Sequence, residues 1–165
     1  MYRAKSIPFA SDGDCAVARY SKKDDGGINV DNRDYIISEG TFRDNNFDNE
    51  EDRMGEAYCS AWRSGWCRVR FFALTPWGNY QILGTDYTSF SVVYSCTTSL
   101  GGAARPEWLW ILTRDPLEIG TPEHDAMTET VFAVINEHVP GFFDDNELRP
   151  TVQTTGSGCE YWPAP

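Results

Sequence analysis

Cysteine and histidine are the residue types in this chain of 165 residues most able to do chemistry, and their spacing favours disulfides over metal binding. The five cysteines are scattered singly, as Cys15, Cys59, Cys67, Cys96 and Cys159. No two of them form a Cys-x-x-Cys motif, and only two histidines accompany them, so a zinc site is not expected. Single cysteines along a strand-rich chain instead favour disulfides and an oxidising compartment.

Catalytic motifs are not apparent in the sequence. His124 and His138 both fall within one predicted helix, away from the predicted strands. The chain has no Gly-x-Ser-x-Gly motif and no glycine-rich phosphate loop. A cysteine nucleophile would need an activating base, and no such base lies near a cysteine in the sequence. We therefore predict that the protein is not an enzyme.

An acidic segment at residues 40–52 begins like a calcium-binding EF-hand loop but does not continue as one. Asp44, Asn46 and Asp48 fit the first three ligand positions. The position that requires glycine holds Asn49, and the position of the closing glutamate holds Gly55. We interpret the segment as a solvated acidic loop rather than a metal site.

Composition limits the classes of partner. The chain has 25 acidic and 14 basic residues and a net charge of −11, so it should repel nucleic acid and anionic membrane surfaces. No apolar run approaches the roughly 18 residues of a membrane-spanning helix, so stable membrane insertion is not expected. An aromatic share of 14% combined with a mean hydropathy of −0.48 suits a barrel that is apolar inside and polar outside.

Eight short segments have the residue types of strands, and hairpin-length links with no helix join them. Such a series predicts an all-β fold, an eight-stranded antiparallel up-and-down β-barrel. The predicted strands, in order, cover residues 1–8, 15–21, 28–37, 53–58, 66–72, 80–83, 90–96 and 108–113.

One C-terminal helix is predicted after the last of these strands. Thr121 is a suitable N-cap, Pro122 suits the first helical position, and Pro140-Gly141 provides a stop. An apolar stripe at helical spacing should pack against the outside of the barrel, and it consists of Met127, Val131, Val134 and His138.

Two stretches carry a family resemblance. Residues 85–96 read TDYTSFSVVYSC, and residues 110–116 read WILTRDP. They resemble the second and third signature regions of the lipocalins, most closely in the branch of apolipoprotein D, the insect bilin-binding proteins and the crustacyanins. The family's Gly-x-Trp motif is absent, and Met1 falls where its tryptophan would be. The resemblance implies one secreted lipocalin domain over residues 1–165, with a first strand that begins part-way. No signal peptide is apparent, so a secreted form would be mature or trimmed.

The resemblance also sets which residues face the barrel interior. Alternation then places nearly all strand charges on the opposite face, as with Arg19, Glu56 and Arg70. Small side chains among large aromatics argue for a ligand cavity, and the alternative is a solid core. The residues expected to line the ligand site are Ala18, Tyr20, Val30, Asn32, Ala57, Val69, Phe71, Tyr80, Ile82, Ser91, Val93, Trp108 and Trp110.

The lipocalin resemblance implies non-covalent binding of a hydrophobic small molecule. The ligands characteristic of this branch are carotenoids and biliverdin-type tetrapyrroles, so a hydrophobic chromophore is expected, for coloration, storage or transport. No arginine or lysine is expected on the inner face. This favours a carotenoid over a bilin, although bilin propionates could reach solvent at the mouth. The alternatives are a carrier of fatty acid, retinoid or steroid, or a lipocalin-fold enzyme that acts on a lipid.

Disulfide pairing follows from the same resemblance. Cys59 and Cys67 share the inner face on adjacent strands that flank one loop, so they are expected to be bonded. In this lipocalin branch, a bond such as Cys15–Cys159 ties the tail to the barrel. Cys96 would then be free or paired externally.

The barrel mouth is expected at one end of the predicted strands. Links that alternate between the two ends would place residues 7–14, 38–52, 73–79 and 97–105 there. Four aromatic residues in these links form an expected rim for a protruding ligand or for a second subunit of a homo- or hetero-oligomer, namely Phe9, Phe42, Phe47 and Trp77.

Overall fold

The computed structural model describes residues 2–4, 13–42, 55–71, 74–97, 106–145, 147–153 and 159. Strands dominate these residues, and the helices follow the last long strand. The elements in chain order are β1 (Tyr2–Ala4), β2 (Asp14–Lys22), β3 (Ile28–Ile36), β4 (Thr41–Phe42), β5 (Gly55–Cys59), β6 (Trp66–Arg70), β7 (Gly78–Thr85), β8 (Phe90–Cys96), β9 (Glu107–Thr113), α1 (Pro122–His138), α2 (Phe142–Asp145) and β10 (Leu148–Pro150).

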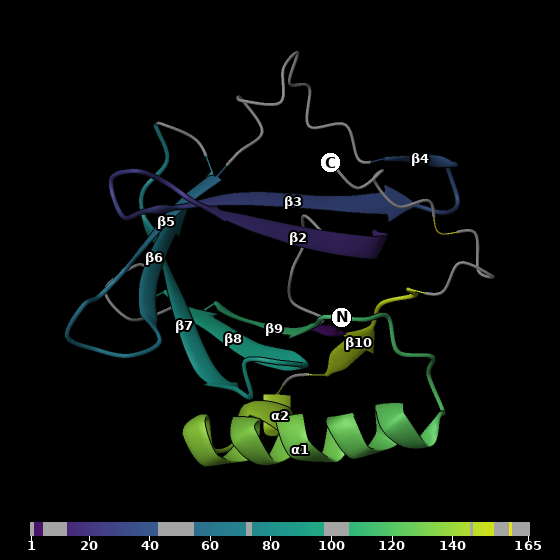
Figure 1. Ribbon diagram of the computed structural model, residues 1–165. Helices are drawn as coiled ribbons and strands as arrows, with labels where there is room; N and C mark the ends of the chain where they lie inside the picture. The colour runs from purple at the N-terminus through teal and green to yellow at the C-terminus, as the bar shows by residue number, and fades with distance from the viewer. Residues whose placement is uncertain are drawn as a thin grey trace.

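The strands form one antiparallel sheet that curls into a half-barrel. Its order is β10-β1-β9-β8-β7-β6-β5-β3-β2, with β4 paired to β3. Figure 1 shows β2 and β3 crossing one side of the molecule and β7, β8 and β9 crossing the other, with β5 and β6 joining the two sides. The predicted all-β, up-and-down architecture with a C-terminal helix packed outside is confirmed. The small elements β4, β10 and α2 were not predicted.

The two edges of the curled sheet are joined by side chains and the C-terminal tail. Among the described residues no ladder connects β2 with β1 or β10. Arg149 donates from Nη2 to both carboxylate oxygens of Asp14, each at 3.1 Å, and the Val152 N–H donates to Asp14 Oδ1 at 3.0 Å. The disulfide between Cys15 and Cys159 lies beside these contacts. This seam therefore takes the place of a closing ladder in the described part of the barrel.

A bulge at the start of β2 directs the backbone toward the seam. The β2–β3 register shifts between Asp14 and Val17, and Cys15 has a φ of 52°. That left-handed conformation is uncommon for a residue other than glycine. The Cys15 N–H donates at 2.8 Å to the carbonyl oxygen of Val152 in the tail. The bulge thus turns the Cys15 N–H away from β3 and toward the tail at the opposite edge of the sheet.

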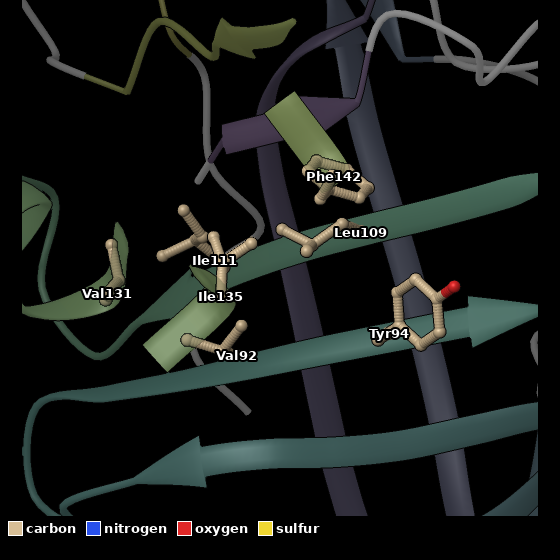
Figure 2. Close-up of a cluster of buried hydrophobic side chains, with 7 residues drawn as sticks. All are labelled: Val92, Tyr94, Leu109, Ile111, Val131, Ile135 and Phe142. Atoms are coloured by element: carbon tan, nitrogen blue, oxygen red, sulfur yellow. The ribbon is translucent and has the colours of Figure 1, made fainter. Parts of the chain in front are cut away.

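The main hydrophobic core lies between the convex face of the sheet and the helices. Figure 1 shows α1 beneath β8 and β9, and Figure 2 shows their side chains meeting. Cores of this kind contribute about 1.5–3 kcal/mol for each fully buried aliphatic side chain. The buried members are Val92, Tyr94, Leu109, Ile111, Val131, Ile135 and Phe142.

The helix begins as predicted, but one face of it differs from the prediction. The Thr121 side chain accepts a hydrogen bond from the His124 N–H at 3.3 Å, and Pro122 follows it. Val131 is buried, as expected from the apolar stripe. His138 was wrongly placed in that stripe, because it is exposed in the last turn, and Ile135 is buried instead.

The turn between β7 and β8 is organised by Asp86. Its Oδ1 accepts hydrogen bonds from the N–H groups of Thr88, Ser89 and Phe90 at 2.8–3.0 Å. The hydroxyl of Ser89 also donates to Asp86. These bonds lower the pKa of the Asp86 carboxyl well below its ordinary value, led by the bond from the Ser89 hydroxyl. Bonds of this kind, between an Asp side chain and backbone N–H groups just after it, are typical of tight turns.

The two disulfides should differ in their effect on stability. Cys15–Cys159 spans 144 residues and Cys59–Cys67 spans 8. In the loop-entropy account, the long link stabilises by about 5 kcal/mol and the short link by about 2.5 kcal/mol. We expect Cys15→Ala/Cys159→Ala to lower the free energy of unfolding by roughly twice as much as Cys59→Ala/Cys67→Ala. Urea denaturation of both double variants measures this difference. Equal losses would mean that the long disulfide at the seam does not stabilise the fold more than the short one.

Gly84 should be required where α1 docks on β7. A Cβ atom at this position would lie 2.8 Å from Cγ1 of Val134. Overpacking of this kind costs about 1–3 kcal/mol, so Gly84→Ala should lower the free energy of unfolding by that amount. In a Val134→Ala background the same substitution should cost less, because the clashing methyl group is gone. Denaturant titration compares the two losses of unfolding free energy. An equal loss in the Val134→Ala background would mean that the clash with Val134 is not what destabilises the Gly84→Ala variant.

Candidate functional site

The strand register places the predicted ligand-site residues on the concave face of the sheet. Directly opposed pairs share one face of an antiparallel ladder. From β2 to β9 the register pairs Ala18 with Asn32, Tyr20 with Val30, Ala57 with Val69, Ile82 with Val93 and Val93 with Trp110. Tyr80 lies opposite Cys67, Ser91 opposite Leu112, and Trp108 opposite Ser95, while Phe71 follows β6 directly. Their role in binding stays a prediction.

The concave face is less covered than the convex face. Ile111, on the convex face of β9, is 0% exposed, whereas Tyr20 and Phe71 keep 47% and 37% of their surface. Trp108 and Trp110 are half-buried, and Asn32 is exposed. Val30, Ala57 and Val93 are the buried members of the predicted set. A solid core would bury the aromatic members as fully as Ile111, so the concave face differs from the core under α1.

A hydrogen bond between two tyrosines crosses the concave face. The hydroxyls of Tyr20 on β2 and Tyr80 on β7 lie 3.0 Å apart. Four interstrand steps separate these strands along the sheet, about 19 Å at the usual spacing. Two tyrosine side chains do not reach that far across a flat sheet, so the contact requires the curl. Burial raises the pKa of both hydroxyls, and both stay protonated at neutral pH.

Two tryptophans form one wall of this face. Trp108 and Trp110 project from the same side of β9, with ring centroids 6.4 Å apart and planes inclined at 63°. This edge-to-face arrangement is favourable for aromatic pairs. Because the rings are half-buried, part of their surface stays available to a ligand.

Charged side chains collect on the outer face of β5 and β6. Glu56 accepts a hydrogen bond from Nζ of Lys23 at 2.9 Å and is also bonded by the guanidinium of Arg70. Arg70 and Lys23 hold the pKa of the Glu56 carboxyl below its ordinary value. The predicted separation of charged and apolar faces therefore holds for these strands.

The prediction that the inner face offers no arginine or lysine was wrong. Lys22 is the last residue of β2 and shares the parity of Tyr20. In the edge strands, Arg149 lies opposite Arg3, which in turn lies opposite Trp110. β10 was not predicted as a strand, so the parity of Arg149 could not be assigned. Ser95 and Leu112 also face inward by register but were not among the predicted site residues, although the alternation of their strands extends to both.

The expected aromatic rim is only partly visible. Trp77 is half-buried, with its ring 5.7 Å from that of Tyr58 and the Arg70 guanidinium 4.6 Å from its centroid. It packs against the outer face and does not project freely, so its place in an exposed rim was wrong. Phe9, Phe47 and the side chain of Phe42 lie outside the described residues, as does most of the acidic segment at residues 40–52.

The cysteines are arranged as the resemblance implied. Cys15 is bonded to Cys159 and Cys59 to Cys67, while Cys96 is a free thiol of intermediate burial in β8. His124 is buried at the start of α1, where its Nδ1 lies 3.1 Å from Asp125 Oδ1. Neither this histidine nor His138 reaches the concave face. Within the described residues, no three His, Cys, Asp or Glu side chains gather as a metal site would need.

A small crevice among the described residues does not qualify as a ligand site. It has a volume of about 20 Å³, lies between the start of α1 and the sheet, and is lined by Ile111, Leu117 and His124, among others. It can hold about one water molecule, so it is too small for an organic ligand. No helix in this part of the chain is long and apolar enough to span a membrane.

Comparison with curated proteins finds relatives of similar sequence. The chain is 34% identical to rat (Rattus norvegicus) apolipoprotein D over 116 residues, which are 70% of this chain and 57% of the relative. It is 32% identical to the Lazarillo protein of Schistocerca americana over 111 residues, 66% of this chain and 48% of that protein. The chain thus spans only about half the length of these relatives. No family model matches it.

Comparison with solved structures finds the same architecture at low sequence identity. Lobster apocrustacyanin A1 aligns with a TM-score of 0.63 and 15% identity, over 92% of this chain and 74% of that one. Insecticyanin from Manduca sexta aligns with a TM-score of 0.66 and 13% identity, over 94% and 76% of the two chains. Strand order, curl and the helix packed outside together define a protein of the antiparallel β-barrel class. The chain belongs to the lipocalin family, in the branch of apolipoprotein D, bilin-binding proteins and crustacyanin.

Stability should depend on the convex face of β9 more than on its concave face. A buried Ile→Ala substitution typically costs about 2–5 kcal/mol and a fully buried Trp→Ala about 3–5 kcal/mol. Because Trp110 is only half-buried, we expect Trp110→Ala to lower the free energy of unfolding by less than Ile111→Ala. Urea denaturation of the ligand-free variants measures both losses. A larger loss for Trp110→Ala would mean that the concave face is a solid core.

Proposed function

We propose that this protein binds a hydrophobic small molecule non-covalently on the concave face of its curled sheet. The observation that carries the proposal is the difference between the two faces. The convex side of β8 and β9 is fully buried under α1, whereas the aromatic concave side keeps exposed surface. Aromatic side chains with accessible faces and few polar groups are typical of sites for apolar ligands.

The ligand we favour is an extended conjugated pigment, a carotenoid ahead of a biliverdin-type tetrapyrrole. Trp108 and Trp110 offer adjoining aromatic surfaces along one strand, and such surfaces pack well on conjugated systems. Arg149 falls on the inner face by register, but its guanidinium is hydrogen-bonded to Asp14. The inner face therefore gives little support to the two propionates of a bilin. Coloration, storage or transport of the pigment would be the biological role.

A secreted protein with a binding role fits the other features. Two disulfides suit an oxidising compartment. The acidic surface disfavours nucleic acid as a partner. Assembly as a homo- or hetero-oligomer stays a proposal, as does the treatment of residues 1–165 as one lipocalin domain.

Two alternatives keep the same fold. A carrier of fatty acid, retinoid or steroid would use the same concave face for a colourless ligand. A lipocalin-fold enzyme that acts on a lipid would need an acid–base group on that face, and His124 and His138 both lie on α1. We therefore rank the enzyme below both binding functions.

Protein purified from its natural source should carry a visible absorption band that passes into organic solvent on extraction. The chromophore added back to recombinant protein should restore the band. Trp110→Ala should weaken that rebinding, because the ligand loses a wall of its site. Trp62→Ala is the matched control, since Trp62 is 94% exposed in the β5–β6 turn and should leave rebinding unchanged.

The outcomes separate the candidate functions. A colourless protein that releases lipid on extraction would support the carrier instead of the pigment protein. Turnover of an added lipid would support the enzyme. Equal rebinding by the Trp110→Ala and Trp62→Ala variants would remove Trp110 from the site.

A further inference from the structure

We propose that the hydroxyl pair of Tyr20 and Tyr80 is the polar anchor of the concave face, and that it selects ligands whose inner end carries an uncharged oxygen. The preferred group is a hydroxyl or a carbonyl, in preference to a carboxylate or a bare hydrocarbon end. This inference rests on the proposed binding function and specifies the chemical class of its ligand.

The pair lies across the concave face, where a bound ligand can reach it. Tyr20 and Tyr80 come from strands 60 residues apart in sequence, and their hydroxyls meet at 3.0 Å. Tyr20 lies two residues before the end of β2, and Tyr80 is the third residue of β7. In the proposed binding mode, the end of the ligand that lies between these two strands meets the tyrosines.

The hydrogen-bonding capacity of the pair is not exhausted. The two hydroxyls carry two protons between them, and the bond between them uses one. The second O–H is left to donate to another acceptor. A hydroxyl left without a partner in an apolar site is costly. A ligand oxygen satisfies this donor, whereas a hydrocarbon end leaves it unsatisfied.

The surroundings of the pair are uncharged. Val30 lies opposite Tyr20 in the β2–β3 ladder, and Cys67, in its disulfide with Cys59, lies opposite Tyr80. Burial raises the pKa of both tyrosines, so the pair is neutral at physiological pH. It acts as a hydrogen-bond donor without adding a negative charge.

A carboxylate at this place would lack a buried cation among the side chains that the structure describes. Arg149 donates to both carboxylate oxygens of Asp14. Lys22, two residues beyond Tyr20 on the same parity, is exposed at the end of its strand. Taking an ionised carboxylate out of water without a partner is strongly unfavourable, so the site should disfavour acids.

An apolar row completes the site beside the anchor. Ile82 follows Tyr80 by two residues on β7 and faces Val93 on β8, which faces Trp110 on β9. The concave face thus places this neutral polar pair beside a continuous apolar strip. An elongated apolar molecule with one neutral oxygen at its end matches this pattern.

The test uses three probes with one carbon skeleton: all-trans-retinol, anhydroretinol and all-trans-retinoic acid. Dissociation constants are measured by quenching of tryptophan fluorescence, with the full chain and its disulfides intact, at neutral pH. We expect retinol to bind about 3–10-fold more tightly than anhydroretinol, since one neutral hydrogen bond separates them. Retinoic acid should bind more than about 10-fold more weakly than retinol.

The double variant Tyr20→Phe/Tyr80→Phe should bind retinol and anhydroretinol equally, because it loses both hydroxyls and keeps both rings. Tyr94→Phe is the matched control. It removes a hydroxyl that bonds Glu107 on the convex face and should keep the preference for retinol. Urea denaturation checks that all variants fold.

The remaining outcomes would contradict the tyrosine anchor. Equal binding of retinol and anhydroretinol by the unaltered protein would overturn the anchor, as would tightest binding of retinoic acid or a preference that survives in the double variant. In those cases binding itself is established and the proposed function stands. Failure of all three probes to bind would also overturn the anchor, because no ligand with a neutral oxygen at its end would be held, while the absorption and extraction experiment decides the proposed function separately.

Discussion

The structure depends on one contact between distant parts of the chain, the seam at Asp14 and Cys15. A curled sheet that does not close by a ladder leaves two edges with unpaired backbone groups. Here the tail crosses to β2, where Asp14 accepts hydrogen bonds from the Arg149 guanidinium and the Val152 N–H. A buried carboxylate is tolerated only with such partners. The disulfide to Cys159 adds a covalent link at the same place.

The seam holds the two edges of the curled sheet together, and the curl gives the two faces different environments. The convex face of β8 and β9 packs against α1, where residues such as Val92 and Ile135 are completely buried. Hydrophobic stabilisation is therefore concentrated outside the curl. The concave face is not needed as the main core, and its aromatic residues can keep surface for a ligand. Stability thus depends mainly on the convex side of these strands, and the proposed binding uses their concave side.

The lipocalin architecture persists here at low sequence identity. The two solved structures named above share only 13–15% of residues with this chain and still align over more than nine-tenths of it. Strand alternation and antiparallel register constrain whether a position is apolar or polar, but not which amino acid occupies it. The proposed choice of ligand depends instead on particular side chains, such as Tyr20, Tyr80 and Trp110. The family is therefore easier to establish than the ligand.

The sequence by itself determined the local features, because each depends on neighbouring residues. Alternation along β9 placed Trp108 and Trp110 on one face. Thr121 and Pro122 marked the start of α1. Hairpin-length links indicated the up-and-down order of the strands, and the lipocalin resemblance added which strand faces point inward and how four cysteines pair.

Only the tertiary structure decided which distant residues meet. Arg149 reaches Asp14 across 135 positions, and Tyr20 reaches Tyr80 across 60. Both contacts follow from the curl of the sheet, which accumulates over many strands and leaves no mark in any short segment. The burial of Ile135 in place of His138 likewise depends on how α1 is rotated against β8 and β9. Helical spacing gives the period of an apolar stripe, but packing against the sheet selects which residues are buried.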